Sequence, residues 1–550
     1  MEQTTRPNAE VLSVLPNKVS IAVSDLDKFN LPGEKIKVGS YLRIVDGEDA
    51  MMIAIIENFS VVPSVDPTEP MGRSYVFEAI PLGIIRNGVF ERGGDSIAIP
   101  PKEVTPATFD DINKIYAESI PYKERFCFSS LSADKSIAVP INGNNFFNKH
   151  IAIIGSTGSG KSHTVAKIIQ SAVEMRSGNY SGLNNSHIII FDIHSEYRTA
   201  FPNANYLDVT NLYLPYWMLN SEELQELFID SSGSNDYNQR NAFKEGVVFS
   251  KKSYYNGPAE KRELVSYDTA TVFDIRDVLN HLIELNEEMV EGARSMKAGP
   301  MNGKLSNFIS RLQNRINDPR LQFLLGDEVL ALTFADTLRQ FIGYGDKKSN
   351  VTIVDLSGVP FEVLSITVSF ITRMLFEYGY YYKRLRCIND PNERINNDTP
   401  FLLVYEEAHK YVPDSSLSKY RASRQSIERI AKEGRKYGIT LMLASQRPSE
   451  ISETIFSQCS NFITMRLTNP NDQNYVKRLL PDTMGRLIEK MPTLRSGEAL
   501  LIGESVVLPS IVKIDCCEDK PSSNDIPYLE LWQDRWQEPD IEEIVSSWRQ

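Results

Sequence analysis

The residues most plainly suited to chemistry form a glycine-rich loop, "GSTGSGKSHT", which runs from Gly155 to Thr164. It fits the pattern G-x-x-x-x-G-K-[ST], in which backbone N–H groups wrap phosphates, the lysine reaches the β- and γ-phosphates, and the hydroxyl binds Mg²⁺. The loop predicts a bound nucleoside triphosphate, ATP or GTP, with Ser162 on the metal ion. A structural glycine turn is the alternative. The predicted nucleotide-binding residues are Gly155, Ser156, Thr157, Gly158, Ser159, Gly160, Lys161, Ser162 and His163.

Two adjacent carboxylates follow an apolar run in "FLLVYEEAH". An enzyme with a phosphate-binding loop needs one acid to hold the Mg²⁺ shell and often a second to polarise water. We predict that Glu406 takes the first role, as a metal-binding and catalytic residue, and that Glu407 takes the second, as the catalytic base. The usual first residue is Asp, which is shorter by one methylene. The alternative is an acidic strand end that is exposed to solvent.

Two further polar residues could complete such a site. Gln446 ends the apolar run "ITLMLAS", where it could sense the γ-phosphate, although a polar strand terminus is common in any parallel sheet. Arg435 lies near the end of "ERIAKEGRKYG", a basic helix that precedes Gly438. It could act as an arginine finger toward a neighbouring subunit's nucleotide. Cations are favoured at the carboxyl end of a helix in any case, so both interpretations of Arg435 stay open.

These residues need a parallel sheet to bring them together. The run "IAII", the glycine-rich loop, a helical pattern and the strand "HIIIFDIHSEY" form a βαβ unit, so we predict an α/β core with a parallel-rich sheet. The β-branched runs before it are typical of a small barrel or sandwich. The tail is either an arm that docks on a neighbour or a short helix on its own domain. The predicted boundaries are 1–125 (β-rich domain), 126–209 (core, first part), 210–348 (helical insertion), 349–515 (core, second part) and 516–550 (C-terminal arm).

Composition sets limits on the class of protein. The net charge is −13, whereas a monomeric protein that binds duplex DNA is usually basic, so any nucleic-acid contact must come from a local patch. Five cysteines without C-x-x-C spacing and six scattered histidines argue against disulfides and a structural metal. No run approaches the ~20 apolar residues of a membrane helix. We therefore expect a cytoplasmic protein with no membrane contact.

Taken together, the segments "HIAIIGSTGSGKSHT", "FDIHSEY", "VDLSGVP", "LLVYEEAHKYVP", "EGRKYGITLMLASQRPSEI" and "LRSGEALLIGE" closely resemble the HerA-type ATPases of the HerA–FtsK group. These are hexameric RecA-fold DNA translocases of bacteria and archaea, and the likeness is to the bacterial, nuclease-associated kind. The resemblance implies a RecA-like ATPase core, an N-terminal β-barrel and a helical insertion. It covers nearly the whole chain in order.

The resemblance also implies roles for individual residues. Lys161 and Ser162 would bind ATP and Mg²⁺, Glu406 and Glu407 would take the two acidic roles, and Gln446 would fit the sensor position. Arg435 in "EGRK" would be the arginine finger that acts in trans. The family's D-x-H-x-E-Y stretch falls on Asp192, His194 and Glu196, which we expect near the active site or subunit junction without a firm role; a turn held by polar side chains is the alternative.

The implied partners are a homohexamer, double-stranded DNA threaded through the central pore, and a separately encoded nuclease. That nuclease could be NurA-like, sirtuin-like or another effector, in DNA end processing or anti-phage defence. The candidates for basic pore contacts are Lys251, Lys252, Lys419, Arg421 and Arg424, each of which could equally be a solvated surface charge.

Three functions compete at this point. The first is an ATP-driven DNA translocase or helicase. The second is an ATPase ring that assembles and regulates a partner nuclease without essential translocation, which the acidic charge favours. The third, a nucleotide-sensing signalling ATPase, usually carries helical repeats, and none is visible in the sequence.

Overall fold

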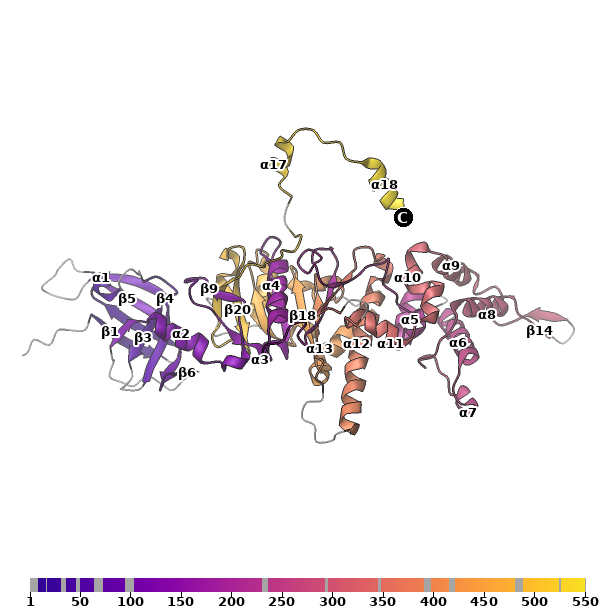
Figure 1. The fold of residues 1–550 in the computed structure, drawn as a ribbon, viewed down its shortest axis with the longest axis horizontal. Coiled ribbons are helices and arrows are strands. Elements are labelled where there is room, and N and C mark those ends of the chain that lie inside the picture. Colours follow the sequence, from indigo (N-terminus) through magenta and orange to yellow (C-terminus); the bar gives the residue numbers. More distant parts are fainter. Residues whose placement is uncertain are drawn as a thin grey trace, which may run out of the picture.

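The computed structural model shows three folded regions in a row and a separate C-terminal arm (Figure 1). From left to right in that view they are a curled β-sheet, a central sheet flanked by helices, and a group of helices. Among the residues that the structure describes, no helix is long and apolar enough to cross a membrane. The described residues are 8–15, 17–30, 36–45, 50–63, 73–93, 103–229, 236–291, 295–344, 348–389, 397–414, 421–479, 488–523 and 526–549.

The first region is a seven-stranded antiparallel sheet in the order β1-β2-β5-β4-β3-β7, with β6 paired to β5. Alternate residues of the strands are buried, because successive side chains point to opposite faces. A single pairing between Glu10 on β1 and Glu103, the residue before β7, joins the two edges of the sheet. The sheet therefore curls back on itself, which supports the predicted barrel in part. The strands are β1 (Ala9–Leu15), β2 (Lys18–Val23), β3 (Tyr41–Val45), β4 (Ala50–Pro63), β5 (Arg73–Arg86), β6 (Val89–Arg92) and β7 (Val104–Pro106).

The central sheet has ten strands in the order β13-β16-β12-β17-β18-β11-β19-β20-β21-β9. The neighbours from β13 to β19 pair in parallel and the remaining three strands are antiparallel, which confirms the α/β core with a parallel-rich sheet. The strands are β9 (Ser129–Leu131), β11 (His150–Ile154), β12 (His187–Asp192), β13 (Asn205–Leu207), β16 (Val351–Asp355), β17 (Phe401–Tyr405), β18 (Ile439–Ser445), β19 (Cys459–Thr464), β20 (Glu498–Gly503) and β21 (Ser510–Ile514).

Helices cover both faces of this sheet. On β12, Ile189 packs in one core with α12 (Phe361–Asn389) and α13 (Arg421–Glu433). Its neighbour Ile190 packs in a second core with α4 (Lys161–Glu174). A strand covered on both faces must be apolar at every position, which explains the unbroken runs "IAII", "IIIF" and "FLLV".

The third region lies in the chain between β13 and β16, where we predicted a helical insertion. It contains helices and, as the sequence did not indicate, a two-stranded ribbon of β14 (Met289–Glu291) and β15 (Met296–Ala298) that projects at the far right of Figure 1. Its helices are α5 (Ser221–Phe228), α6 (Asp236–Tyr254), α7 (Ala259–Arg262), α8 (Ile275–Glu287), α9 (Ser306–Ile316), α10 (Gln322–Leu325) and α11 (Phe334–Phe341).

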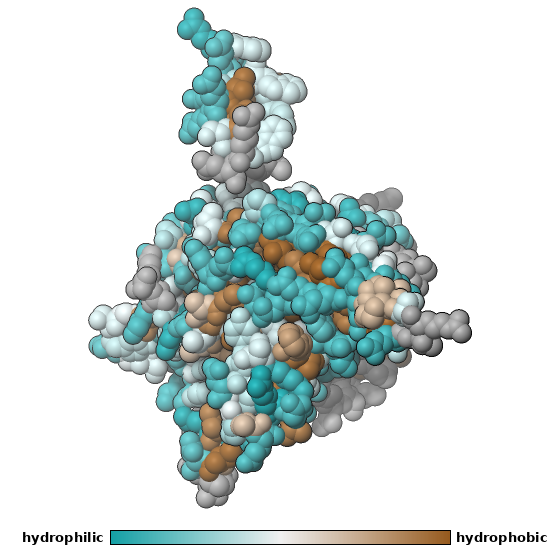
Figure 2. Space-filling view, turned by 90° about the vertical axis from the view of Figure 1, so that its right-hand side faces the viewer, coloured by the Kyte–Doolittle hydropathy of each residue, from teal (hydrophilic) through white to brown (hydrophobic). Residues whose placement is uncertain are grey.

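The C-terminal tail holds two short helices, α17 (Tyr528–Gln533) and α18 (Ile541–Arg549). Two perpendicular views show these helices standing clear of the three folded regions (Figure 1 and Figure 2). In this structure the two helices therefore do not pack on the other regions of their own chain.

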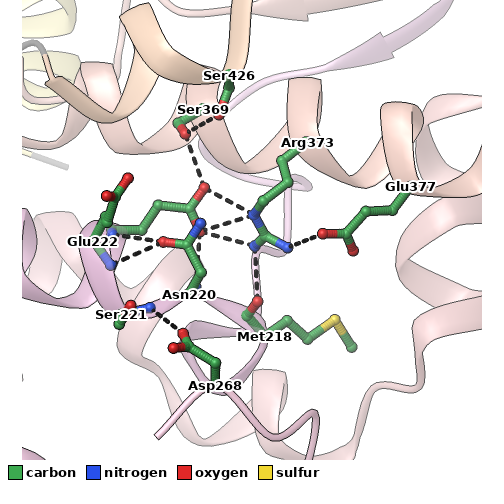
Figure 3. A network of polar contacts seen from close by, with 10 residues as sticks. Met218, Asn220, Ser221, Glu222, Asp268, Ser369, Arg373, Glu377 and Ser426 are labelled. Carbon is green, nitrogen blue, oxygen red and sulfur yellow. Dashed lines mark hydrogen bonds and ion pairs between the residues drawn. The ribbon is translucent and has the colours of Figure 1, made fainter. Parts of the chain in front are cut away.

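A buried ion pair fastens the helical region to the core (Figure 3). The guanidinium of Arg373, on α12, lies 2.8 Å from Glu223 Oε2 on α5, and the Glu223 side chain is fully buried. Ser369 donates a hydrogen bond to the same carboxylate, and Arg373 also donates to the carbonyl oxygen of Met218. Removing one partner of such a pair typically costs 3–5 kcal/mol, roughly, because the other charge is left buried. This ion pair thus joins the helical region to a helix that covers the central sheet.

Candidate nucleotide-binding active site

The glycine-rich loop joins the carboxyl end of β11 to the start of α4. Gly160, the residue before α4, has a φ of 102°, a left-handed conformation that favours glycine. A Cβ atom on Gly155 would lie 2.5 Å from Ser159 Oγ, closer than atoms can approach without a shift. Gly160 thus allows a left-handed backbone conformation, and Gly155 leaves room for the side chain of Ser159.

Lys161 and Glu407 meet at the carboxyl edge of the central sheet. Lys161 Nζ lies 4.0 Å from Glu407 Oε1, and each side chain is only 8% exposed. Glu407 directly follows Glu406 at the end of β17 and has a φ of 50°, which residues other than glycine rarely adopt. Such conformations persist where the surrounding structure enforces them, and they cluster at active sites. The fold thus places an acid opposite the phosphate-binding lysine.

Glu406 is held from the other side by a tyrosine. Its Oε2 accepts a hydrogen bond of 2.6 Å from the hydroxyl of Tyr197, and both residues are buried. Tyr197 lies in the turn after β12, where its backbone N–H donates to Asp192 Oδ2 at 2.9 Å. Because β12 and β17 are adjacent parallel strands, their carboxyl ends bring this turn and the acidic pair together.

The two adjacent carboxyl groups have opposite pKa shifts. Burial raises the pKa of Glu406 to about 8, and the negative charge of Glu407 adds to that effect. Burial also opposes ionisation of Glu407, but the imidazole of His409 and the charge of Lys161 outweigh it and lower the pKa of this carboxyl. His409 Nδ1 lies 3.2 Å from Glu407 Oε2. Glu407 therefore favours the ionised form, whereas Glu406 favours the protonated form.

Ser162 faces a third acid. Its hydroxyl donates a hydrogen bond of 2.8 Å to Glu196 Oε2, and the charge of Glu196 also acts on Glu406. A hydroxyl and carboxylates are the hard oxygen ligands that Mg²⁺ prefers, and a cation there would relieve the repulsion between the acids. In the described part of the chain no group of three or more His, Cys, Asp or Glu side chains could hold a metal ion by itself. Mg²⁺ usually keeps several waters and phosphate oxygens as ligands, so Ser162 and Glu406 fit it.

The remaining residues of the D-x-H-x-E-Y stretch have different surroundings. Asp192 is buried and accepts from the backbone N–H groups of His194 and Tyr197, so it stabilises the turn. The side chain of His194 is exposed. The fold places Glu196 against the glycine-rich loop, whereas Asp192 has the turn-stabilising role that we named as the alternative.

Gln446 lies beside the glycine-rich loop. Its Oε1 accepts a hydrogen bond of 2.7 Å from Thr157 Oγ1, and it follows β18, the strand next to β11. A side chain in contact with the loop can respond to the terminal phosphate, as the sensor hypothesis requires.

Arg435 lies at the opposite, amino edge of the sheet. It belongs to a 3-10 turn, Gly434–Tyr437, that precedes β18, and its side chain is exposed. Its positive charge acts on His150, at the start of β11. The seven residues of β18 separate Arg435 from the carboxyl edge by roughly 20 Å, so it does not reach the glycine-rich loop of its own chain.

Residues 126–375 match the family model described as the central domain of helicase HerA. The matched part is similar to that domain and makes up less than half of the chain. It includes the glycine-rich loop, the Asp192–Tyr197 turn and the helical insertion, while the acidic pair, Arg435 and Gln446 lie beyond its carboxyl end.

Two relatives and one solved structure are similar to much of this chain. The "DNA double-strand break repair helicase HerA" of Sulfolobus acidocaldarius is 28% identical over 410 residues, which cover 74% of this chain and 72% of that protein. The "Probable DNA double-strand break repair helicase HerA" of Methanocaldococcus jannaschii is 25% identical over 538 residues, which cover 92% and 96%. The solved structure of VirB4 of Thermoanaerobacter pseudethanolicus is 13% identical with a TM-score of 0.47, covering 74% of this chain and 99% of that one.

Of the basic residues considered for DNA contact, Lys251 is the clearest correction. This residue is 1% exposed, and its ammonium group donates to the carbonyl oxygens of Tyr267 and Thr269. Burial lowers its pKa to about 8, so it is a structural residue and not a surface contact.

Of the other four basic candidates for DNA contact, two have carboxylate partners, one is exposed and one is outside the described residues. Lys252 pairs with Glu263 at 2.5 Å, and Arg424 donates to Glu428. Arg421, the first residue of α13, is exposed. Lys419 falls outside the described residues.

Sequence reasoning missed two residues of this site, Tyr197 and His409. Both stand inside the segments that resemble the family, "FDIHSEY" and "LLVYEEAHKYVP", one and two positions from predicted residues. Tyr197 reaches Glu406 because β12 pairs with β17, whereas His409 contacts Glu407 from two positions along the same segment.

Proposed function

We propose that this protein is an ATPase that uses ATP hydrolysis to move along, or unwind, double-stranded DNA. The observation that carries the proposal is the contact of Lys161 Nζ with Glu407 Oε1 at 4.0 Å, at the carboxyl edge of the central sheet. Residues 126–375, which match the central domain of helicase HerA, supply part of that sheet. A phosphate-binding lysine beside a buried, ionised carboxylate is the arrangement that nucleotide hydrolysis needs. The names of the relatives, DNA double-strand break repair helicases, suggest the substrate.

In the proposed reaction, Lys161 and the loop backbone hold the β- and γ-phosphates of ATP. Glu407 is the general base, because it is ionised and lies next to the phosphate-binding lysine. Ser162 and Glu406 would hold Mg²⁺, which neutralises charge on the phosphates when it is bound. Gln446, already in contact with Thr157, would sense the γ-phosphate.

The site is completed by a second subunit in this proposal. Arg435 lies on the edge of the sheet opposite its own glycine-rich loop, so any catalytic role of its guanidinium would be toward a neighbour's nucleotide. A contact that joins one edge of a subunit to the opposite edge of the next is head-to-tail, and repeated contacts of this kind form a ring when their rotation closes. We infer a ring, and the resemblance to HerA-type ATPases sets its number at six.

The DNA would pass through the centre of this ring. With a net charge of −13, the outer surface repels nucleic acid, so phosphate contacts would be confined to a few basic side chains in the pore. Such contacts are independent of sequence and weaken with added salt. A separately encoded nuclease, NurA-like, sirtuin-like or of another kind, would act on the DNA, in end processing or in anti-phage defence.

The acidic charge also favours a second candidate, a ring that organises and regulates a nuclease without essential translocation. The two candidate functions predict different nuclease activities when the ATP site is inactivated. If the Lys161→Ala ring supports the nuclease as well as the unaltered ring does, the scaffold is the essential function and the motor is not.

The test of the motor is the ATPase rate with and without blunt duplex DNA, at low and at physiological salt. We expect duplex DNA to raise the rate several-fold at low salt and less at higher salt, because the phosphate contacts are screened. Lys161→Ala gives the background rate. An ATPase rate that is the same with and without duplex DNA, at both salt concentrations, would contradict the proposal.

A further inference from the structure

A cavity of about 920 Å³ lies at the amino edge of the central sheet, where β12 and β17 begin side by side. Residues from the end of α4 and from the segment 122–125 complete its walls. The 14 residues of α4 span about 20 Å, and the glycine-rich loop lies at the other end of that helix. The cavity is therefore separate from the ATP site of the same chain. Its volume is in the range of small-ligand sites, about 300–1,000 Å³.

Three basic side chains line this cavity, those of Lys123, Arg125 and Arg176. No aspartate or glutamate is present among its described lining residues. Within the part of the chain that the structure describes, none of the three cations forms an ion pair with a carboxylate. The whole chain has a net charge of −13, so a cavity that collects cations alone indicates an anionic ligand.

The acids that stand near these residues in the chain do not neutralise them. Glu124 accepts a hydrogen bond of 2.7 Å from Asn142, and Asp398 pairs with Arg386 at 3.2 Å. Glu174, at the end of α4, is exposed and does not line the cavity. The positive charge of the cavity is thus available to a ligand.

Two tyrosines on the lining pair aromatic rings with these cations. Tyr122 is 84% exposed and Tyr180 is 47% exposed. The guanidinium of Arg125 lies 5.7 Å from the ring centre of Tyr122, and that of Arg176 lies 5.7 Å from the ring centre of Tyr180. Bases stack on aromatic rings and phosphates pair with cations, so each Tyr–Arg pair suits one nucleotide. The apolar lining residues are Phe147, Ala172, Met175, Ile188, Pro400, Phe401 and Leu402.

Hydrogen bonds hold the wall that follows α4 in place. Arg176 donates to the carbonyl oxygen of Gly182 at 2.9 Å, and the amide of Asn184 donates to that of Ala172 at 2.8 Å. The amide of Asn350 donates to the carbonyl oxygen of Asn184 at 2.7 Å. The cavity is therefore formed before any ligand binds, which lowers the entropy cost of binding.

We propose that this cavity binds a dinucleotide, two bases joined through phosphate. One base stacks on Tyr122 and the other on Tyr180, while the phosphates lie among Lys123, Arg125 and Arg176. An inorganic anion would leave the aromatic and apolar lining unused, and a single nucleotide would occupy only one Tyr–Arg pair. The inference goes beyond the proposed function and depends neither on the ring nor on ATP hydrolysis.

Isothermal titration calorimetry of the full-length protein with the linear dinucleotide pApA tests the site. We expect one pApA per chain, and AMP should bind about tenfold more weakly because it stacks on one tyrosine only. Lys161→Ala should bind pApA as the unaltered protein does, since the glycine-rich loop is a separate site. For the same reason, ATP should not displace pApA.

Two variants locate the binding in the cavity. Tyr122→Ala removes a stacking surface and Lys123→Glu reverses a charge, so each should weaken pApA binding about tenfold. Tyr237→Ala, at a tyrosine that is 77% exposed in the helical insertion, and Lys135→Glu, at an exposed lysine outside the lining, are the matched controls. Both controls should keep the affinity. Unchanged binding of a fluorescent ATP analogue shows that the variants are folded.

Four results would overturn the proposal. They are no binding of pApA, equal affinity in Tyr122→Ala and Lys123→Glu, loss of binding in Lys161→Ala, and equally tight binding of pyrophosphate. Much tighter binding of a longer oligodeoxyadenylate than of pApA would also overturn it, because the ligand would then be a DNA strand. The DNA-stimulated ATPase assay tests the proposed function alone, so the two proposals can fail separately.

Discussion

The two edges of the central sheet differ in the kind of residue that they hold. At the carboxyl edge, charged groups are buried and face one another, as with Lys161 and Glu407 at 4.0 Å. At the amino edge, Arg435 is exposed and His150 is buried in its neutral form. Parallel strands place everything that follows them at one edge and everything that precedes them at the other. Neither edge of one chain holds all the residues proposed for catalysis. A complete site would therefore need the carboxyl edge of one subunit and the amino edge of another.

The largest effects are expected from breaking each edge in turn. Lys161→Ala and Arg435→Ala should each lower the ATPase rate of the assembled protein by about 10⁴-fold, because each proposed site needs one residue from each edge. Only Lys161→Ala should lose binding of a fluorescent ATP analogue. Lys436→Ala, an exposed cation next to Arg435, is the matched control and should keep the rate.

Co-expression of the two inactive variants sharpens this result. If the edges belong to different subunits in the active site, about one site in four of a mixed ring regains both intact residues, and activity returns. A mixed ring that stays at background would show that Arg435 does not act across the subunit contact.

Glu407→Gln should lower hydrolysis about 10³-fold while ATP binding remains, because the amide cannot accept a proton from water. Rapid-quench measurement of a single turnover, together with binding of the ATP analogue, separates the two steps. Hydrolysis at the normal rate in this variant would remove Glu407 from the catalytic role.

Tyr197→Phe should have a smaller effect, about tenfold on the ATPase rate, because Glu406 loses a buried hydrogen bond of 2.6 Å. The Mg²⁺ concentration that gives half-maximal activity should rise with it, since the carboxylate is less firmly positioned. Tyr206→Phe is the control: its hydroxyl binds Asp355 and does not contact Glu406. Equal effects of the two variants would show a general loss of stability instead.

The smallest effect concerns the amino edge and changes stability alone. Burial lowers the pKa of His150 to about 4, below its unfolded value of about 6.5. The unfolded chain therefore binds a proton first as the pH falls, so His150 costs stability below about pH 6.5, and by up to about 3 kcal/mol near pH 4. His150→Asn should flatten this part of the dependence of the unfolding free energy on pH, measured by urea denaturation. A slope that stays unchanged would mean that other groups set it.

Sequence pattern predicted the parts of the fold that depend on local physics. Unbroken apolar runs indicated strands covered on both faces, and the glycine spacing indicated the loop before α4. The short strands of the N-terminal sheet and the helices between β13 and β16 also follow from local patterns. The ribbon of β14 and β15 was missed because its two strands of three residues each, exposed in most positions, are too short to show an alternation of apolar and polar residues.

The sequence by itself determined which groups the candidate site contains: the loop with Lys161 and Ser162, and the adjacent acids Glu406 and Glu407. Tertiary structure decided what each group does there. Glu406 and Glu407 are the same residue type one position apart, yet deeper burial raises the pKa of Glu406, and the contacts with His409 and Lys161 lower the pKa of Glu407. The order of the parallel strands brings Tyr197 to Glu406 and places Arg435 at the opposite edge of the sheet. That order is set by packing between segments that are distant in the chain, so neighbouring residues in the sequence do not determine it.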